Sequence, residues 1–149
     1  MTSDIVLRSC DAGDIPRVLD LWQRAGVELG ITDTAQELAR LLADSPATLI
    51  VAIQDVELVG SVIAAWDGWR GNIYRLAVAP DIRRQGCARM LVERAEQVLR
   101  SRGAVRISAL VDQTHPRALA FWDSLAALGY AREPRDTRYL KTVEVNDAR

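Results

Sequence analysis

The segment from residue 71 to residue 100 restricts the fold of this chain more than any other. It reads GNIYRLAVAP DIRRQGCARM LVERAEQVLR. The β-prone run from Ile73 to Val78 stops at Ala79-Pro80, a short basic stretch with one glycine follows, and an amphipathic helix begins at about Gln85. The sequence therefore predicts a strand, a glycine-containing loop and a helix in direct succession.

This succession of elements is suited to binding an anion. The first N–H groups of a helix have no partner within the helix, and the helix dipole adds partial positive charge at the same end. Gly86 permits a ligand to approach the backbone closely, and Arg83, Arg84 and Arg89 add positive charge. Two common phosphate-binding loops are excluded, because the segment contains neither G-x-x-x-x-G-K-[ST] nor G-x-G-x-x-G.

Length and charge narrow the class of protein. A chain of 149 residues is expected to form one domain that spans residues 1–149. The 19 Lys and Arg residues against 20 Asp and Glu residues give a net charge of −1, which argues against nonspecific binding of nucleic acid or of an anionic membrane. The sequence has no apolar run of membrane-spanning length and no signal pattern, so we expect a cytoplasmic protein.

The metal-ligating residues are few. The single histidine, His115, and the two isolated cysteines, Cys10 and Cys87, predict no metal site and no disulfide framework. Both cysteines are expected to act as small, partly buried apolar residues. For Cys87, which lies in the predicted anion loop, a reactive thiol is the alternative.

Hydrophobic periodicity predicts the order β-α-α-β-β-β-α-β-α-β, a mixed α/β (α+β) domain around one sheet. The predicted strands span residues 5–8, 48–53, 57–66, 73–78, 105–111 and 139–143. The predicted helices run from Asp11 or Asp14 through Trp22, and over residues 34–43, 85–102 and 116–128. The Asp67-Gly68 pair predicts a hairpin turn, so the second to fourth strands are expected to form an antiparallel meander.

The loop itself resembles a known signature. Arg83-x-x-Gly86-x-Ala88 is similar to the [QR]-x-x-G-x-[GA] motif of the GNAT superfamily of N-acetyltransferases, and residues 74–80 resemble the strand that leads into it. The predicted order of elements matches the same family over nearly the whole chain. The resemblance, to the compact bacterial type, implies a mixed, mostly antiparallel sheet of six to seven strands flanked by about four helices.

The same resemblance implies an acetyl-CoA site. The strands at 73–78 and 105–111 are expected to splay apart, with the pantetheine arm of the cosubstrate between them. Leu76, Ala77 and Val78 are then expected to bind that arm through their backbone, with the Val78 N–H stabilising the thioester oxyanion; a plain core strand is the other reading, and the two are compatible. The residues implied in pyrophosphate binding are Arg83, Arg84, Gln85, Gly86, Cys87, Ala88 and Arg89.

A second segment, residues 112–130, both resembles the family and departs from it. The family commonly has A-x-x-F-Y and, four residues later, G-F or G-Y. This chain has Ala118 to Trp122 and then Gly129-Tyr130, which leaves about three extra residues between them. That excess is close to one helical turn, so the helix can absorb it directly or through a local bulge.

Trp122 stands where the family tyrosine often protonates the departing CoA thiolate. An indole N–H donates a hydrogen bond but does not give up a proton near neutral pH. Three accounts stay open: Trp122 orients the sulfur while water gives the proton, a tyrosine such as Tyr130, Tyr74 or Tyr139 is the acid, or the protein binds acyl-CoA and catalyses poorly. His115 replaces a family Asn and is either a CoA contact or a solvent-facing residue at a helix start.

The incoming amine must lose a proton before it attacks, and the sequence does not select the group that accepts it. The candidate bases are Glu28, Asp33, Asp67, Asp112 and, less directly, His115. Each carboxylate is more typical of a solvated surface residue or a cap than of a catalytic base. By resemblance, residues 26–33 are expected to lie over the acceptor side.

The resemblance implies an acetyl-CoA-dependent N-acetyltransferase that acts on a primary amine by direct attack in a ternary complex. A small-molecule amine is favoured over a peptide N-terminus as acceptor, because the sequence indicates no acidic or basic groove for a protein partner. A homodimer is compatible with the family. The alternatives are a non-catalytic acyl-CoA-binding or sensing module and a different nucleotide-binding α/β protein.

Overall fold

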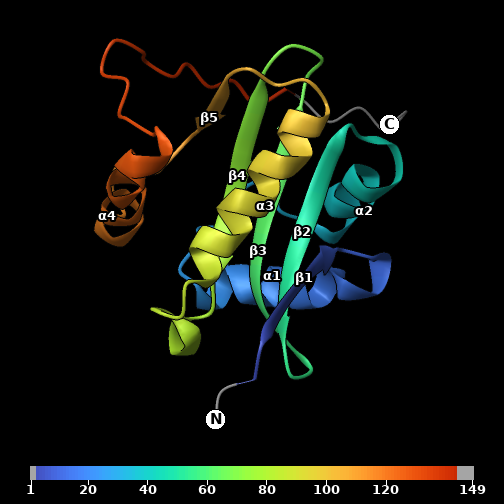
Figure 1. The fold of residues 1–149 in the computed structure, drawn as a ribbon. Coiled ribbons are helices and arrows are strands. Elements are labelled where there is room, and N and C mark those ends of the chain that lie inside the picture. The colour runs from blue at the N-terminus through green and yellow to red at the C-terminus, as the bar shows by residue number, and fades with distance from the viewer. Residues whose placement is uncertain (1–2, 144–149) are drawn as a thin grey trace. The chain divides into compact units, whose positions relative to one another are not determined.

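Five strands form one open sheet in the computed structural model, which describes residues 3–143 of the chain (Figure 1). Their order in the sheet follows the chain, and every neighbouring pair is antiparallel except β4 and β5, which are parallel. The strands are β1 (Ile5–Ser9), β2 (Ala47–Gln54), β3 (Glu57–Trp66), β4 (Gly71–Val78) and β5 (Ile107–Ala109). The predicted meander of β2, β3 and β4 is confirmed.

The predicted sheet of six to seven strands is wrong for the described residues, where the sheet has five. The expected final strand at 139–143 is irregular, and the expected strand at 105–111 contracts to Ile107–Ala109. Tyr139 and Val143 are β-prone but lie 94% and 74% exposed. A β-prone run without a face to bury and without a partner strand gains too little to order as a strand.

The described residues form four α-helices, the predicted number. They are α1 (Ile15–Arg24), α2 (Ala35–Asp44), α3 (Cys87–Ser101) and α4 (Pro116–Asp123), with 3₁₀ turns η1 (Ala12–Asp14), η2 (Pro80–Ile82) and η3 (Ser124–Leu128). The start of α2 illustrates how local sequence sets these bounds. Thr34 is its N-cap, and the Thr34 hydroxyl accepts a 3.1 Å hydrogen bond from the Glu37 N–H.

Neighbouring residues of β3 show that helices cover both faces of the sheet. Gly60 faces α3, because a Cβ built there would lie 2.9 Å from Leu91 Cδ1 and 3.0 Å from Cys87 Sγ. The next residue, Ser61, faces α1 and accepts a 2.8 Å hydrogen bond from the Trp22 indole. Since successive side chains of a strand point to opposite faces, α1 and α3 lie on opposite sides, as Figure 1 shows.

The missing Cβ of Gly60 lets α3 approach β3 closely. Leu91, Ala95 and Leu99 of α3 are fully buried in that contact, as the helical periodicity predicts. The close contact fixes the start of α3, and therefore the loop before it, against the sheet.

The described chain forms two compact units, residues 3–110 and residues 111–143. The first contains the whole sheet with α1, α2 and α3, and the second contains α4 and η3. The two units are described separately below. That the chain folds as a single domain stays a prediction.

Candidate functional site

The strand β4 has a partner on its β5 side along only part of its length. Its Gly71, Asn72 and Ile73 pair with Ile107, Ser108 and Ala109, and the pairing ends there. From Tyr74 to Val78 the strand continues without a β5 neighbour, and Figure 1 shows β5 beside only one end of β4. The predicted divergence of these two strands is therefore present as an open edge of the sheet.

The direction of the backbone N–H groups reverses along β4. The Gly71 N–H donates to the Arg106 carbonyl on the β5 side at 3.0 Å, whereas the Ala79 N–H donates to Val59 of β3 at 2.8 Å. Two residues an even number of positions apart should face the same neighbour in a regular strand. The reversal requires one inserted residue between them.

That insertion is a β-bulge at Arg75. The register passes from Ile63 opposite Tyr74 to Ser61 opposite Ala77, so one residue of β3 faces two residues of β4. Arg75 has φ of 52°, a left-handed conformation that costs a non-glycine residue roughly 1–2 kcal/mol. Counting back from Ala79, strand alternation then turns the N–H groups of Leu76 and Val78 away from β3, toward the open edge.

The loop after β4 ends in a helix start that has no side-chain cap. Gly86 is the N-cap of α3 with φ of 80° and ψ of 8°, and the first backbone bond of the helix runs from Met90 N–H to Gly86 O at 3.0 Å. The N–H groups of Cys87, Ala88 and Arg89 precede that bond and have no intrahelical acceptor. A Cβ built at Gly86 would meet nothing within 4 Å, so the N-cap position itself is uncrowded.

The polar side chains of the loop differ in whether they already bind other residues. Arg89 binds Glu93 at 3.0 Å, which offsets part of its charge. The Gln85 side chain accepts a 3.1 Å hydrogen bond from Gln54 at the end of β2, which ties the loop to the sheet. Arg84 is exposed and, like Arg75, has a positive φ, of 70°, while Arg83 is half-buried. Arg83 and Arg84 are the loop residues whose charge is best available to an anion.

Cys87 packs under the loop. Its side chain is 2% exposed, and burial raises the pKa of the thiol to about 11. The thiolate, which is the reactive form, is therefore a small fraction at neutral pH. The geometry favours the packing role over the reactive thiol, and leaves the Cys87 backbone N–H as the group that a ligand can reach.

The second unit contains His115, Trp122 and Tyr130. His115 is the N-cap of α4 and its side chain makes no capping hydrogen bond, while its Nε2 lies 3.9 Å from Asp112 Oδ2. The Trp122 and Tyr130 rings meet edge to face, with centroids 5.1 Å apart and planes inclined by 72°. Both rings are half-buried.

The extra residues between Trp122 and Gly129 form a 3₁₀ segment rather than a further α-helical turn. The α-helix ends at Asp123, and η3 continues to Leu128 with Leu125 in a non-helical conformation. Gly129, with φ of 97°, stops the segment as predicted. The sequence readings, a further α-helical turn or a local bulge, therefore both differ from the structure, in which the helix tightens to 3₁₀ and Tyr130 follows directly.

Three of the four candidate carboxylate bases are already occupied by hydrogen bonds. Asp67 accepts from the N–H groups of Trp69 and Arg70, and Asp112 accepts from the Thr114 N–H and hydroxyl. These bonds lower the pKa of each carboxyl, as expected for turn caps. Glu28 is exposed in the α1–α2 connection.

Asp33 is the buried member of this set. Burial alone raises its pKa, but hydrogen bonds from the Arg75 guanidinium and the Gly30 N–H outweigh burial, so the pKa lies below its usual value. A carboxylate held this way accepts a proton poorly. Asp33 is therefore a poor general base, and its contact with the bulge residue Arg75 was not predicted from the sequence.

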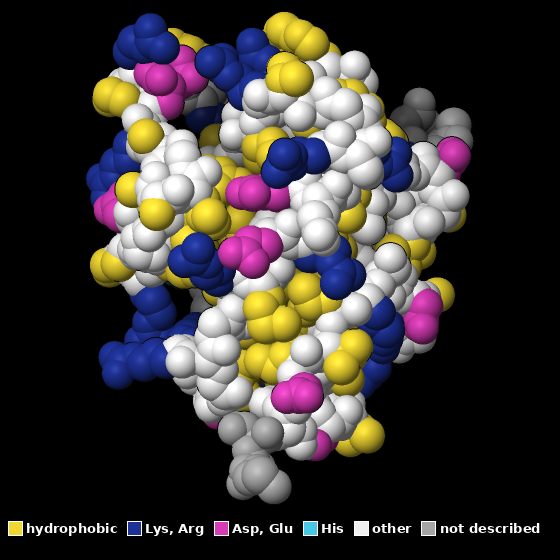
Figure 2. Space-filling view, in the orientation of Figure 1, with side chains coloured by type: hydrophobic (Ala, Val, Ile, Leu, Met, Phe, Trp, Pro, Cys, Tyr) yellow, Lys and Arg dark blue, Asp and Glu magenta, His cyan; other side chains and the backbone are white. Residues whose placement is uncertain are grey.

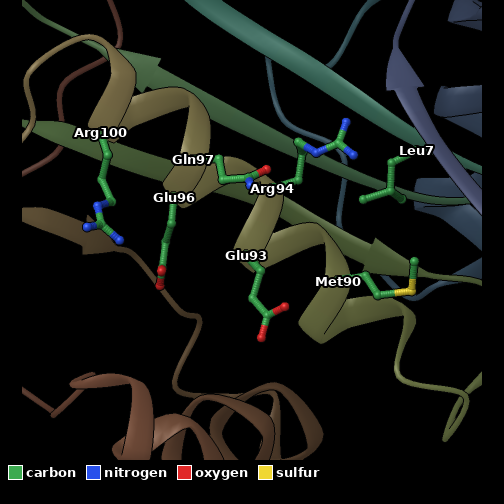
Figure 3. Close-up of a pocket in the computed structure, with 7 residues that line it drawn as sticks. All are labelled: Leu7, Met90, Glu93, Arg94, Glu96, Gln97 and Arg100. Carbon is green, nitrogen blue, oxygen red and sulfur yellow. The ribbon is translucent and has the colours of Figure 1, made fainter.

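Two hollows of the first unit have no lining residue from β4. One of about 390 Å³ runs beside the outer face of α3 (Figure 3); its lining residues are Leu7, Met90, Glu93, Arg94, Glu96, Gln97 and Arg100. Around α3 in Figure 2, acidic and basic side chains are interspersed and form no single broad basic patch. The candidate site is thus the open edge of β4 together with the loop and helix start that follow it.

Two further observations concern metal ions and membranes. Among residues 3–143, no three His, Cys, Asp or Glu side chains gather closely enough to hold a metal ion. In the same part of the chain, no helix combines the length and apolar character needed to cross a membrane.

Comparison with known proteins connects this geometry to a family. The model of the "Acetyltransferase (GNAT) family" matches residues 15–130. An acetyltransferase of Pectobacterium atrosepticum is 33% identical over 112 residues, which cover 75% of this chain and 79% of that protein.

Solved structures share the fold at lower identity. The PaiA N-acetyltransferase of Thermoplasma acidophilum, in complex with coenzyme A, has a TM-score of 0.70 and 14% identity over 81% of this chain and 87% of its own. The aminoglycoside N-acetyltransferase AAC(6')-Iy, in complex with a CoA bisubstrate analogue, has a TM-score of 0.71 and 18% identity over 95% and 100%.

Proposed function

The chain belongs to the GNAT acetyltransferase family, and on that premise we propose that it moves an acetyl group from acetyl-CoA to a primary amine by direct attack in a ternary complex. The observation that carries the proposal is the pairing of an open β4 edge with an uncapped helix start in one strand–loop–helix segment. The open edge is suited to an extended arm that contains amides, and the helix start is suited to a pyrophosphate.

These two features support a proposed position for the cosubstrate. The pyrophosphate binds the N–H groups at the start of α3, with Gly86 leaving the approach open and Arg83 and Arg84 supplying charge. The pantetheine arm then lies along β4, where Leu76 and Val78 present their N–H groups at the open edge. His115 is a further proposed contact of CoA.

In the proposed reaction the neutral amine attacks the thioester carbonyl carbon. A C–N bond forms, the carbonyl oxygen becomes an oxyanion, and the C–S bond then breaks to release CoA as thiolate. The Val78 N–H stabilises the oxyanion; removing such a donor typically costs ~10²–10³ in rate. The surplus proton of the amine passes to solvent or to a base, and the thiolate takes a proton.

Water and the Tyr130 hydroxyl are the two proposed sources of the proton for the thiolate. Trp122 does not supply it, because its indole N–H keeps its proton at neutral pH. A CoA thiolate is a fairly good leaving group, so water can supply the proton. Loss of a general acid typically costs ~10²–10⁴-fold in rate, which slows turnover without abolishing it.

We favour a small-molecule amine as acceptor over a peptide N-terminus. The near balance of 19 basic and 20 acidic residues indicates no broad surface of one charge sign for a polypeptide partner. A structural relative of this chain was solved with an analogue that joins CoA to an acetylneamine, an amine of low molecular mass. The Trp122 substitution favours a second candidate, a non-catalytic acyl-CoA-binding or sensing module.

Product formation separates the two candidates. Purified protein is incubated with acetyl-CoA and a panel of primary amines (an aliphatic diamine, an amino sugar, an amino acid amide and a short peptide). Release of CoA that depends on one amine, with the acetylated amine detected by mass spectrometry, supports the transferase. Saturable acetyl-CoA binding without amine-dependent release over the whole panel supports the sensing module.

A further inference from the structure

An ion pair joins the α1–α2 connection to the bulge of β4. The Arg75 Nε donates to Asp33 Oδ1 at 2.8 Å and its Nη2 donates to Asp33 Oδ2 at 2.6 Å, across 42 positions of sequence. The Asp33 side chain is 5% exposed and that of Arg75 is 35% exposed. Two parallel bonds to a buried carboxylate fix the orientation of the guanidinium as well as its position.

The same carboxylate also fixes its own loop. Asp33 Oδ2 accepts a 2.7 Å hydrogen bond from the Gly30 N–H, and the Asp33 N–H donates to the Gly30 carbonyl at 3.1 Å. The end of the α1–α2 connection is therefore closed on itself and held to β4 through one side chain.

The backbone of Arg75 is held by a second chain of hydrogen bonds. The Trp22 indole donates to the Ser61 hydroxyl at 2.8 Å, and that hydroxyl donates to the Arg75 carbonyl at 2.9 Å. The guanidinium carbon also lies 5.7 Å from the Trp22 ring centroid. A non-glycine residue persists in a left-handed conformation only when its surroundings fix it in this way.

The bulge determines which N–H groups face the open edge. With Arg75 inserted, Leu76 and Val78 present theirs at that edge; without the insertion, alternation would turn Ala77 outward in their place. A shift of this kind moves a hydrogen-bond donor by several ångströms, and a misplacement of 1 Å already costs ~10²-fold in rate.

We propose that Asp33 and Arg75 are positioning residues, whose ion pair fixes the β4 bulge and thereby aims the Leu76 and Val78 N–H groups at the acyl-CoA. This inference rests on the proposed function and names what orients its oxyanion donor. It also accounts for a strained arginine within a strand whose neighbours are regular.

The test compares Asp33→Asn with a matched control, Asp14→Asn. Asp14 is also a buried carboxylate, with a 3% exposed side chain, bound to Arg8 and Arg17 far along the chain from β4. We expect Asp33→Asn to lower kcat ~10–100-fold per folded molecule while the KM for acetyl-CoA stays within about threefold, because the start of α3 is unchanged. Asp14→Asn should lower the melting temperature and leave kcat unchanged.

A double-mutant cycle shows whether the ion pair is the cause. Arg75→Gly keeps a residue that tolerates positive φ but removes the guanidinium, so Asp33→Asn should lower kcat by less than threefold further in that background. If Asp33→Asn does not fold, Arg75→Lys, which keeps the charge and loses the two-bond geometry, should give an intermediate loss of kcat.

Two outcomes would overturn the positioning role. One is a folded Asp33→Asn variant that retains wild-type kcat, whatever its KM for acetyl-CoA; the other is a loss of kcat in Asp33→Asn no larger than that in Asp14→Asn. The wild-type protein is assayed first on the amine panel. Absence of any amine-dependent CoA release would defeat the proposed function itself, whereas an active wild type with an unaffected Asp33→Asn defeats only this inference.

Discussion

The Trp122 indole and the Tyr130 phenol meet edge to face, with ring centroids 5.1 Å apart. The 3₁₀ segment η3 lies between the two residues, and Trp122, which we align by resemblance with the family tyrosine, packs directly on Tyr130. The Tyr130 ring, which carries a hydroxyl, therefore lies beside Trp122, which carries none.

Trp122→Tyr restores a hydroxyl at that position, and we expect it to hold or raise kcat. The reason is that a phenol can protonate the departing thiolate, which indole cannot. Steady-state kinetics with acetyl-CoA and the best amine of the panel measure the change. A variant that folds but loses binding of both CoA and acetyl-CoA would show that Trp122 is a packing residue or a direct CoA contact.

Tyr130→Phe separates the two proposed proton sources. The variant keeps the ring contact with Trp122 and loses only the hydroxyl. If Tyr130 is the acid, kcat should fall ~10²–10⁴-fold, and if water is the source, kcat should stay near the wild-type value. The pH dependence of kcat in both proteins completes the comparison.

Gly86→Glu should abolish the stabilisation that acetyl-CoA gives to the folded protein. The new side chain enters the open space before the α3 N–H groups and brings negative charge toward the pyrophosphate. Gly103→Glu is the matched control, since Gly103 also has positive φ, of 107°, and open surroundings, but lies past the other end of α3. Acetyl-CoA should raise the melting temperature of the wild type and of Gly103→Glu, and should leave that of Gly86→Glu unchanged. An equal shift in Gly86→Glu would refute the assigned pyrophosphate site.

Much of the fold could be predicted from the sequence because its signals are local. The helix predicted to start at residue 34 begins there, the apolar positions of the helix predicted at 85–102 repeat with helical period, and Asp67-Gly68 marks the β3–β4 turn. Each of these depends on residues within a few positions of one another, and each is confirmed.

The predicted strand at 139–143 failed because β-propensity does not provide a partner. Tyr139, Leu140 and Val143 have the right residue types but stay exposed in the structure. Strand formation depends on a free edge and a face to bury, which are tertiary properties.

The bulge at Arg75 was missed for a similar reason. Nothing in the run Ile73 to Val78 distinguishes an arginine with positive φ from one in a regular strand, and its partner Asp33 lies 42 positions away. The candidate loop was recognisable by its residues. The orientation of the strand that precedes it was not.

Both cysteines should resist alkylation in the native protein. Burial raises the pKa of Cys87 to about 11, and burial together with the nearby Asp14 and Asp11 carboxylates raises that of Cys10 to about 11. At pH 8 we expect iodoacetamide to modify neither residue until urea unfolds the chain, as measured by intact mass. Rapid modification of Cys87 under native conditions would instead support a reactive thiol in the loop.

Stability should fall in acid through two buried carboxyls. The Arg8 and Arg17 guanidinium groups and the Asp11 N–H lower the pKa of Asp14, and Asp33 is lowered by Arg75 and Gly30, both from 3.8. The unfolded chain therefore binds protons as the pH falls through 3.8 while the folded protein does not, which favours unfolding. Urea denaturation between about pH 5 and pH 3 should show a smaller loss of unfolding free energy in Asp14→Asn and Asp33→Asn than in the wild type. Asp4→Asn is the control at an exposed site. If the unfolding free energies of Asp14→Asn and Asp33→Asn fall with pH as steeply as that of Asp4→Asn, this assignment is contradicted.

Isothermal calorimetry of the purified protein with acetyl-CoA, with ATP and NAD as controls, tests the central claim most directly. The account predicts saturable binding of acetyl-CoA at one site per chain and no comparable binding of ATP or NAD. A folded protein that does not bind acetyl-CoA would contradict the assignment of the β4 edge and the Arg83–Arg89 loop as a cosubstrate site, and with it the proposed transfer reaction.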